Sequence, residues 1–281
     1  MMAKRIVVTG AGGYIGRHVV TKLCDLGADV IAVGRHLEDM DSRAKKVECD
    51  IFKSGGNIFA DLGSPDVCLH MAWQDGFVHN SDSHMGMLSN HYTFLCNMVR
   101  GGLKQLAVMG TMHEVGYFEG AIDENTPCNP SSMYGIAKDA LRRSMMLFCK
   151  EHHVCLQWLR AYYIYGDDTR NHSIFAKLTQ AEAEGEKVFP FTSGKNKYDF
   201  IDVDELAEQI ASTVMQTEVS GIINCCTGKP VSLADKVEEF IRDHGFSIQL
   251  EYGAFLDRPY DSPAVWGNSD KIERVMRAVQ Y

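Results

Sequence analysis

The 281-residue chain is poor in basic residues and has no long hydrophobic run. Its 28 Lys and Arg residues are outnumbered by 37 Asp and Glu residues, so the formal net charge is -9 at pH 7. Such a composition offers no broad basic surface and argues against binding to nucleic acid or to anionic membranes. Near the start, glycines interrupt the apolar run IVVTGAGG before it reaches the length of a signal peptide core or a membrane span.

The nine cysteines form no C-x-x-C pair and have no regular spacing. This argues against a metal site and a disulfide framework and favours reduced thiols, so we expect a cytoplasmic protein. Apolar residues make up 45% of the chain and charged residues 23%, which is typical of a globular protein rather than a disordered one. At this length we expect one or two domains.

The N-terminal part of the chain alternates short β-rich runs with helical stretches, a pattern typical of a parallel sheet covered by helices. We therefore predict an α/β fold built on a Rossmann-type, doubly wound parallel sheet. The predicted strands are Arg5–Thr9, Asp29–Val33, Lys46–Cys49, Asp66–Ala72, Lys104–Met109 and Val154–Arg160, and the predicted helices are Tyr14–Leu26, Met85–Arg100 and Ser132–His152.

The run VVTGAGGYIG places Gly10, Gly13 and Gly16 directly after the first predicted strand and at the start of the first predicted helix. Gly10 permits a tight turn, Gly13 lets backbone N–H groups approach a pyrophosphate, and Gly16 lets the helix pack against the strand. The positive end of the helix dipole favours the anionic ligand. We therefore predict a dinucleotide site, with a purely structural glycine turn as the alternative.

The end of the second strand, VIAVGRH, bears on the kind of dinucleotide. An acidic residue there normally binds the adenosine ribose of NAD, but this chain has Gly34 followed by Arg35, whose guanidinium suits a 2′-phosphate. We therefore predict NADP(H) in preference to NAD(H). The alternative is that Arg35 is only a solvated surface charge. After the third strand, we expect Asp50 and Ile51 to bracket the adenine, unless Asp50 is only a helix cap or a turn residue.

We predict that residues 1–165 form the dinucleotide-binding domain. Beyond them the pattern loosens, and a helix and a strand within residues 199–226 are expected to return to the main sheet. Residues 166–198 and 227–281 then form a smaller C-terminal substrate lobe. The helices expected outside the first domain and the returning segment are Ser173–Glu184, Leu233–His244 and Asp270–Val279.

Tyr134 and Lys138 stand four residues apart in SSMYGIAK, so on a helix they share one face. Such a pair is weak by itself, since many surface helices contain one. It gains weight from Thr111, which lies just past the fifth predicted strand, at the carboxyl edge where open α/β sheets bind ligands. We predict that these three residues form the catalytic site.

These motifs resemble the extended branch of the short-chain dehydrogenase/reductase family, the NAD-dependent epimerase/dehydratase type. TGAGGYIG, HMAW, YGIAK and RAYYIYG carry the resemblance, which covers nearly the whole chain. It implies a Rossmann-type cofactor domain, a small C-terminal substrate lobe, and catalytic roles for Thr111, Tyr134 and Lys138. In addition to Tyr134 and Lys138, the cofactor contacts expected from these motifs include Tyr14, Ile15, Met71, Ala72 and Trp73.

The resemblance gives these residues a coherent chemistry. A free phenol has a pKa of about 10 and is a poor proton relay at neutral pH. The Lys138 ammonium and the positive charge of the cofactor favour the phenolate of Tyr134, and Lys138 also holds the nicotinamide ribose. In a reduction, Tyr134 protonates the oxygen of the reacting carbonyl and Thr111 donates a hydrogen bond to it.

Relatives that dehydrate nucleotide sugars carry Thr-Asp-Glu where this chain has Thr111, Met112 and His113, so a 4,6-dehydratase is not expected. Tyr163 replaces the Asn that the family often has, which weakens assignment to a typical 4-epimerase. We predict NADPH-dependent reduction of the 4-keto group of a dTDP-, GDP- or CDP-linked 4-keto-6-deoxyhexose. The alternatives are a nucleotide-sugar 4-epimerase with tightly held NAD and a non-enzymatic NADP(H)-binding regulator.

The resemblance also points to four substrate-binding candidates, His113, Tyr163, Lys195 and Arg258. Lys195 and Arg258 would meet the diphosphate. His113 either contacts the sugar or simply fills the cleft, and Tyr163 either stacks on the substrate or packs in the core. Finally, the helices near Met85–Arg100 and Ala137–Lys150 either form the two-fold contact of a homodimer or serve only the monomer core.

Overall fold

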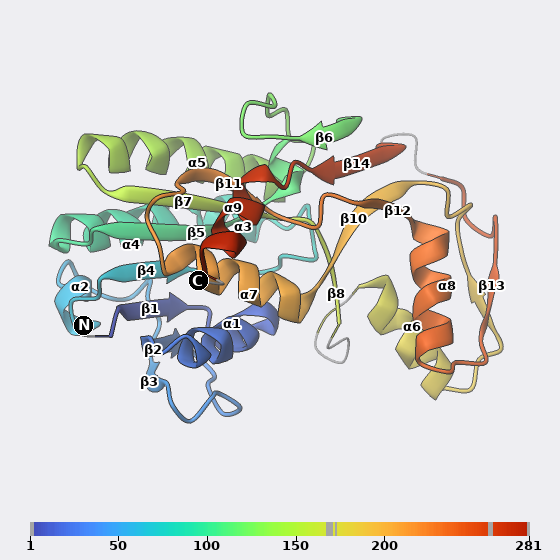
Figure 1. Cartoon of the computed structure of the whole chain (residues 1–281), viewed down its shortest axis with the longest axis horizontal. Coiled ribbons are helices and arrows are strands. Elements are labelled where there is room, and N and C mark those ends of the chain that lie inside the picture. Colours follow the sequence, from blue (N-terminus) through green and yellow to red (C-terminus); the bar gives the residue numbers. More distant parts are fainter. Residues whose placement is uncertain (1–2, 167–170, 172, 258–260, 280–281) are drawn as a thin grey trace.

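The computed structural model describes residues 3–166, 171, 173–257 and 261–279. Its centre is a seven-stranded sheet in the order β3-β2-β1-β4-β5-β7-β11, and every neighbouring pair in it is parallel (Figure 1). This is the strand order of a doubly wound Rossmann-type sheet, so the predicted fold class is confirmed. The strands are β1 (Arg5–Thr9), β2 (Asp29–Gly34), β3 (Lys45–Glu48), β4 (Val67–His70), β5 (Gln105–Thr111), β7 (Cys155–Ala161) and β11 (Gly221–Cys225).

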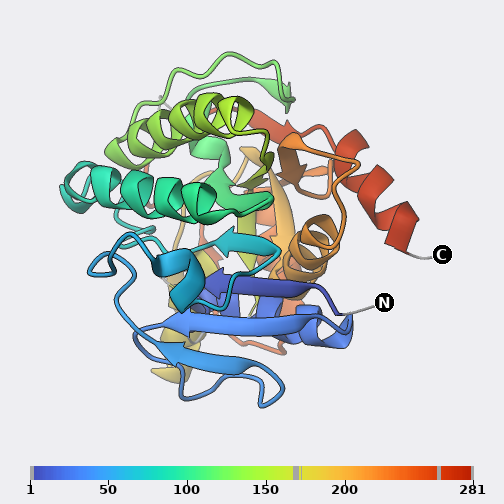
Figure 2. The ribbon, with the colours of Figure 1, turned by 90° about the vertical axis from the view of Figure 1, so that its left-hand side faces the viewer.

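The central strands are buried on both faces because helices cover both sides of the sheet. All seven residues of β5, QLAVMGT, are buried, as expected for an inner parallel strand. One face packs against α1 (Tyr14–Asp25), α7 (Val203–Val214) and α9 (Asp270–Val279). The other packs against α2 (Ile58–Asp61), α4 (Leu88–Gly101) and α5 (Met133–Glu151), and α4 and α5 lie side by side there (teal and yellow-green in Figure 2).

A smaller lobe extends from the carboxyl side of the main sheet (right in Figure 1). It has a hydrophobic cluster of its own, which includes Phe175, Phe191, Phe200 and Phe240. A second sheet of order β12-β10-β14-β6, with β8 also paired to β10, connects this lobe to the region above the main sheet. The strands of this sheet are β6 (Gly120–Ile122), β8 (Tyr163–Tyr165), β10 (Lys197–Asp202), β12 (Pro230–Ser232) and β14 (Ala264–Gly267). The smaller lobe also contains the helices α6 (Ile174–Ala183) and α8 (Leu233–Asp243) and a parallel pair of strands, β9 (Val188–Pro190) and β13 (Gln249–Glu251).

The predicted helix at Met85–Arg100 is two helices in the structure. A short helix, α3 (Ser83–Gly86), is followed by Met87, and α4 begins at Leu88. The short strands of the small lobe were not predicted, because runs of three or four residues show too little alternation to be recognised. The predicted domain limits stay a prediction.

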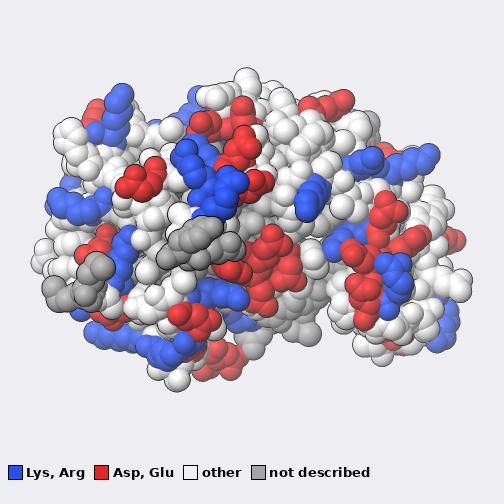
Figure 3. Space-filling model, in the orientation of Figure 1, with Lys and Arg blue, Asp and Glu red and all other residues white. Residues whose placement is uncertain are grey.

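On the face shown in Figure 3, acidic and basic side chains are interspersed rather than gathered by sign. Among the described residues, no helix combines the length and the apolar character needed to cross a membrane.

Candidate active site

The glycine-rich turn between β1 and α1 leaves the start of the helix open to a ligand. Gly10 has a φ of +69°, and a Cβ added there would lie 2.6 Å from the backbone nitrogen of Ala72. A Cβ added to Gly16 would lie 2.3 Å from the Gly10 carbonyl oxygen. Gly13 is the N-cap of α1, so no side chain caps the first N–H groups, and no acidic residue lies in the first turn. Turn and helix thus form the backbone cradle that a dinucleotide pyrophosphate requires.

The residues predicted to meet the adenosine lie beside this turn. Arg35 follows β2 with an exposed side chain. The Asp50 carboxylate accepts a hydrogen bond from the backbone nitrogen of Phe52 at 3.1 Å and lies 3.6 Å from Lys53 Nζ. Asp50 therefore shapes its own turn, while the neighbouring Ile51 is buried. Contacts of these residues with adenine stay a prediction.

The structure brings Thr111, Tyr134 and Lys138 together at the carboxyl edge of the sheet. Thr111 is the last residue of β5, and the other two lie one turn apart on α5. The Thr111 hydroxyl lies close enough to Tyr134 to lower the pKa of its phenol. Lys138 Nζ donates to the carbonyl oxygen of Met109 at 2.7 Å and lies 3.8 Å from the centroid of the Trp73 ring. A cation placed over an aromatic face in this way is stabilised by the ring.

Burial dominates the electrostatics of the pair on α5. It raises the pKa of Tyr134 above that of a free phenol, and the Thr111 hydroxyl opposes the rise only in part. Burial also lowers the pKa of Lys138 to about 7, against the opposing effect of the negative charge of Glu114. Both shifts disfavour the charged forms, so the phenol needs additional positive charge nearby to ionise at neutral pH.

Aromatic and imidazole rings surround the Tyr134 phenol. The ring centroids of Trp73, His79, His84 and His113 lie 6.2, 5.6, 5.2 and 6.2 Å from that of Tyr134. Trp73 Nε1 donates to His84 Nδ1 at 3.1 Å, which fixes the tryptophan ring. Burial lowers the pKa of His113 to about 4, so its imidazole is neutral at physiological pH and can either donate or accept a hydrogen bond.

The four predicted substrate residues occupy different situations. Tyr163 packs against Tyr198 with ring centroids 4.2 Å apart, and its ring centroid lies 6.5 Å from that of His113. It therefore belongs to the wall around Thr111, Tyr134 and Lys138, which we call the triad. The side chain of Lys195 is exposed, and the described residues show no contact between it and the triad. Arg258 lies outside the described residues. Substrate binding by all four stays a prediction.

Sequence reasoning missed a buried pair of histidines beside the site. The Thr9 hydroxyl lies 2.8 Å from His70 Nδ1, and His70 Nε2 lies 2.9 Å from His91 Nδ1. The His91 ring stacks on Trp73 with centroids 4.3 Å apart, and burial lowers its pKa to about 3. His70 stands in the HMAW stretch, but His91 is 21 residues further on and carries no sequence signal that links the two.

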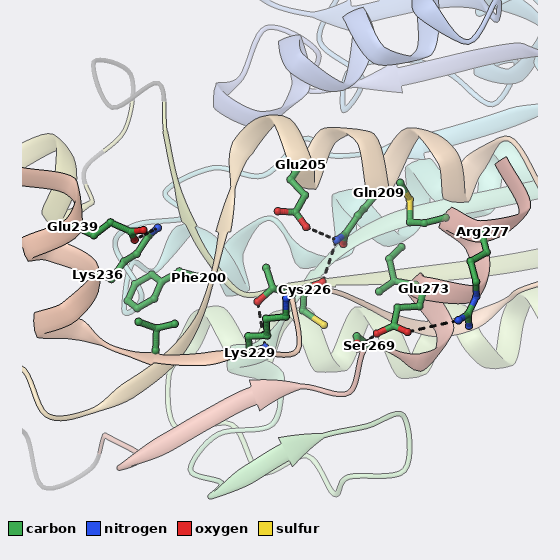
Figure 4. A pocket seen from close by; sticks show the side chains of 14 residues that line it. Phe200, Glu205, Gln209, Cys226, Lys229, Lys236, Glu239, Ser269, Glu273 and Arg277 are labelled. Atoms are coloured by element: carbon green, nitrogen blue, oxygen red, sulfur yellow. Dashed lines mark hydrogen bonds and ion pairs between the residues drawn. The ribbon is translucent and has the colours of Figure 1, made fainter. Parts of the chain in front are cut away.

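A separate pocket of about 550 Å³ lies between α7, α9 and the β12–α8 region (Figure 4). Its wall mixes carboxylates such as Glu205 and Glu273 with cations such as Lys229 and Arg277. None of the residues that line it belongs to the triad or to the glycine-rich turn. This pocket is therefore separate from the site predicted from the sequence.

A Rossmann-type sheet with an open glycine-rich turn and a Thr, Tyr and Lys cluster at its carboxyl edge defines the class of dinucleotide-dependent enzymes that act on a CH–OH group. The family model described as "NAD dependent epimerase/dehydratase family" matches residues 6–226. The chain belongs to this family, which confirms the family resemblance read from the motifs.

Individual relatives agree with this assignment. The chain is 48% identical over 267 residues to a dTDP-6-deoxy-L-talose 4-dehydrogenase (NAD(+)) from Aggregatibacter actinomycetemcomitans, covering 93% of this chain and 98% of that protein. It is 24% identical over 263 residues to a putative UDP-glucose 4-epimerase from Methanocaldococcus jannaschii, covering 88% of this chain and 85% of the relative.

Solved structures match the fold over nearly the whole chain. The Thermus thermophilus UDP-glucose 4-epimerase in complex with NAD has a TM-score of 0.83 at 19% identity, covering 99% of this chain and 93% of that one. The UDP-N-acetylglucosamine 4-epimerase from Methanobrevibacter ruminantium has a TM-score of 0.85 at 19% identity, covering 98% and 92%. At these identities the likeness concerns the fold alone.

The predicted preference for NADP(H) is wrong. The relative at 48% identity is named for NAD(+), and related structures are complexes with NAD. The prediction took the missing acidic residue at Gly34 and the following Arg35 as a signal for a 2′-phosphate. A guanidinium donates hydrogen bonds to ribose hydroxyls as well as to phosphate, so this pair of residues does not exclude NAD.

The predicted NADPH-dependent reduction of a 4-keto sugar is wrong as well. The same relative is named as a dehydrogenase, and the other relatives are named as epimerases. The predicted direction of the reaction depended on the predicted cofactor, because NADPH was taken to indicate net reduction. A Thr, Tyr and Lys site can pass a proton in either direction, so these residues alone carry no information on the direction of the reaction.

Proposed function

We propose that the chain is an NAD⁺-dependent 4-dehydrogenase of a nucleotide-linked 6-deoxyhexose, with dTDP-6-deoxy-L-talose as the first substrate to test. The observation that carries the proposal is the cluster at the carboxyl edge of the sheet, in which Thr111 ends β5 and the half-buried Tyr134 is followed one turn later by Lys138 on α5. The choice of sugar is supported by the 48% identity to a relative named for that reaction.

In this proposal Tyr134 is the base of the oxidation. Its phenolate accepts the proton of the C4 hydroxyl as the C4–H bond breaks, and the Thr111 hydroxyl hydrogen-bonds the sugar oxygen and keeps it in line with the phenol. The ammonium of Lys138 stabilises the phenolate. The wall of Trp73, His113 and Tyr163 excludes water from the reacting centre, which strengthens these interactions.

The residues present fit a dinucleotide. Gly10, Gly13 and the N–H groups at the start of α1 would hold its pyrophosphate, and Lys138 would hold the ribose next to the reactive ring. When bound, NAD⁺ supplies the hydride acceptor and a positive charge near the phenol. Ile51 and Arg35 would meet the adenosine end.

The direct test is to supply the purified chain with NAD⁺ and dTDP-6-deoxy-L-talose, and to follow NADH absorbance together with the sugar product. We expect one NADH for each 4-keto sugar formed. Matched reactions with NADP⁺ and with UDP-glucose should be much slower. A 4-epimer formed without net NADH would instead establish an epimerase and would overturn the proposal.

The two further expectations concern assembly and location. The outer face of α5 exposes Met133, Ile136 and Leu147, which recur at helical spacing. Next to them, Met85, Tyr92 and Leu141 line a groove between α3, α4 and α5. This apolar face supports a homodimer in which a second copy of the chain covers it. The nine free cysteines support a cytoplasmic location.

Replacing Leu147 by glutamate should convert the dimer to a monomer, because the side chain is 61% exposed on the free chain and the change places a charge in the apolar contact. Light scattering coupled to size-exclusion chromatography measures the mass. Leu256→Glu is the matched control, since Leu256 is 92% exposed on the small lobe. Equal masses for the parent and Leu147→Glu would remove this face as the dimer contact.

A further inference from the structure

A carboxylate that is fully buried lies directly behind the catalytic cluster. Glu114 is the last residue of a 3₁₀ helix, η1 (Met112–Glu114), which begins immediately after Thr111, and its side chain is 0% exposed. Its Oε1 accepts hydrogen bonds from the Thr111 backbone nitrogen and from Trp158 Nε1, both at 2.8 Å. The Thr111 hydroxyl accepts from the backbone nitrogen of His113 at 3.3 Å, and the two ends of this turn therefore hold each other.

Two guanidinium groups balance the charge of Glu114. Its Oε2 lies 3.2 Å from Arg160 Nε on β7 and 3.6 Å from Arg142 Nε on α5. Arg160 is itself 0% exposed. Isolated burial of a carboxylate costs several kcal/mol, so a fully buried one is retained only with partners of this kind. Among the described residues, none that lines the pocket of Figure 4 belongs to this network.

The network also reaches the start of α5, which carries Tyr134. A Cβ added to Gly135 would lie 2.4 Å from the carbonyl oxygen of His113, so η1 and the first turn of α5 are in direct contact. A shift of η1 therefore moves the Thr111 hydroxyl and the Tyr134 phenol together. The charge of Glu114 acts over the same short path, raising the pKa of both Tyr134 and Lys138.

We propose that Glu114 is a positioning residue for hydride transfer, which holds the Thr111 backbone and, in balance with Arg160 and Arg142, sets the protonation of the Tyr134 and Lys138 pair. This inference rests on the proposed dehydrogenase function. The Glu114 side chain is fully buried and has no surface for contact with substrate or cofactor, so it acts through Thr111, Tyr134 and Lys138.

Other charged and titratable groups also face this cluster from each packed element. Around Tyr134 and Lys138 they are His79 from the loop before α3, His84 from α3, His113 from η1, His70 from β4 and His91 from α4. Around Glu114 and its arginines they include Asp139 from α5, Asp123 after β6, and Cys128, whose Sγ lies 3.2 Å from Arg160 Nη2. None of them changes in the variants below, so a shift between variants reports the Glu114 network.

Two substitutions should move the protonation of Tyr134 in opposite directions. Glu114→Gln removes a negative charge, which makes the phenolate easier to form, so both limbs of the kcat/KM profile should move to lower pH, by about one unit. Arg142→Met removes a positive charge and should move both limbs to higher pH. In Glu114→Gln, kcat should also fall about tenfold, because the Thr111 turn is loosened.

A second readout requires no sugar. The ultraviolet absorbance of tyrosinate is titrated in the NAD⁺ complex of each variant, and the same titration of its Tyr134→Phe counterpart is subtracted. The Tyr134 step should come at lower pH in Glu114→Gln and at higher pH in Arg142→Met. The matched control is Glu119→Gln, an exposed carboxylate in the same loop whose loss should leave the Tyr134 step in place.

A merely structural carboxylate would change thermal stability without opposite shifts of the Tyr134 step, and that result would overturn the proposal. If Glu114→Gln does not fold, Arg142→Met decides, because it leaves the Glu114 to Arg160 pair intact. An unshifted Tyr134 step in that variant would also overturn the proposal. Opposite shifts of the Tyr134 step in an enzyme that oxidises no nucleotide sugar would instead refute the proposed function, and Glu114 would then be a positioning residue for another reaction of the same three residues.

Discussion

Turnover should fall by about 10³-fold when Tyr134 is replaced by phenylalanine, while NAD⁺ affinity stays nearly unchanged. The substitution removes only the phenol oxygen, which in the proposed mechanism accepts the proton of the sugar hydroxyl. The ring and its contacts with Trp73 and His79 remain, so the fold and the cofactor cradle should persist. Stopped-flow measurement of NADH formation gives the rate, and quenching of protein fluorescence by NAD⁺ gives the affinity.

The control for this experiment is Tyr117→Phe, which removes an exposed phenol that hydrogen-bonds Glu119 a few residues from the site. Its rate should match that of the parent. A Tyr134→Phe enzyme that retained the parent rate would show that another group accepts the proton. The neutral His113 imidazole beside Tyr134 would then be the next residue to replace.

The parts of the site that could be predicted from the sequence are the motifs whose residues lie close together in the chain. Gly10, Gly13 and Gly16 lie close together in the sequence, between the end of the first strand and the first turn of the helix that follows it. Tyr134 and Lys138 share one helical face, so each set can be recognised without knowledge of the fold. Thr111 could be placed because parallel strands bring their carboxyl ends to one edge of the sheet. The doubly wound parallel sheet followed from the alternation of strands and helices.

The parts that could not be predicted depend on contacts between distant segments. Glu114 meets Arg160 across 46 residues, and His70 meets His91 across 21, and neither pair has a spacing that marks it. Gly12 is another example, because an added Cβ would lie 2.0 Å from the carbonyl oxygen of His36, which follows β2. Only the folded chain shows that this glycine has no room for a side chain.

Cofactor choice failed for a different physical reason. Gly34 and Arg35 were taken as decisive by themselves. The difference in binding free energy between NAD and NADP is spread over several hydrogen bonds of comparable strength. Arg35 is exposed, and an exposed guanidinium in water gains little from a single phosphate. A flexible cation at this position is therefore compatible with either dinucleotide.

Replacing Gly10 by alanine should weaken NAD⁺ binding by at least about 100-fold, which corresponds to about 2.7 kcal/mol. Two effects combine at this position. The φ of +69° disfavours any L side chain, and the added Cβ would lie 2.6 Å from the Ala72 nitrogen and 2.8 Å from the Met71 carbonyl carbon. Both neighbours are backbone atoms that cannot rotate away, so the turn itself must move and the cradle for the pyrophosphate opens.

Gly27→Ala is a control that introduces backbone strain without a close contact and outside the turn after β1. Gly27 has a φ of +76°, close to that of Gly10, but a Cβ added there meets nothing within 4 Å. This control should lose about 1 kcal/mol of folding stability from backbone strain and keep the NAD⁺ affinity of the parent. Calorimetric titration with NAD⁺ and thermal unfolding measure the two quantities. Equal affinity in Gly10→Ala and Gly27→Ala would mean that the turn after β1 does not hold the pyrophosphate, because Gly27 follows the C-terminal end of α1 and lies outside that turn.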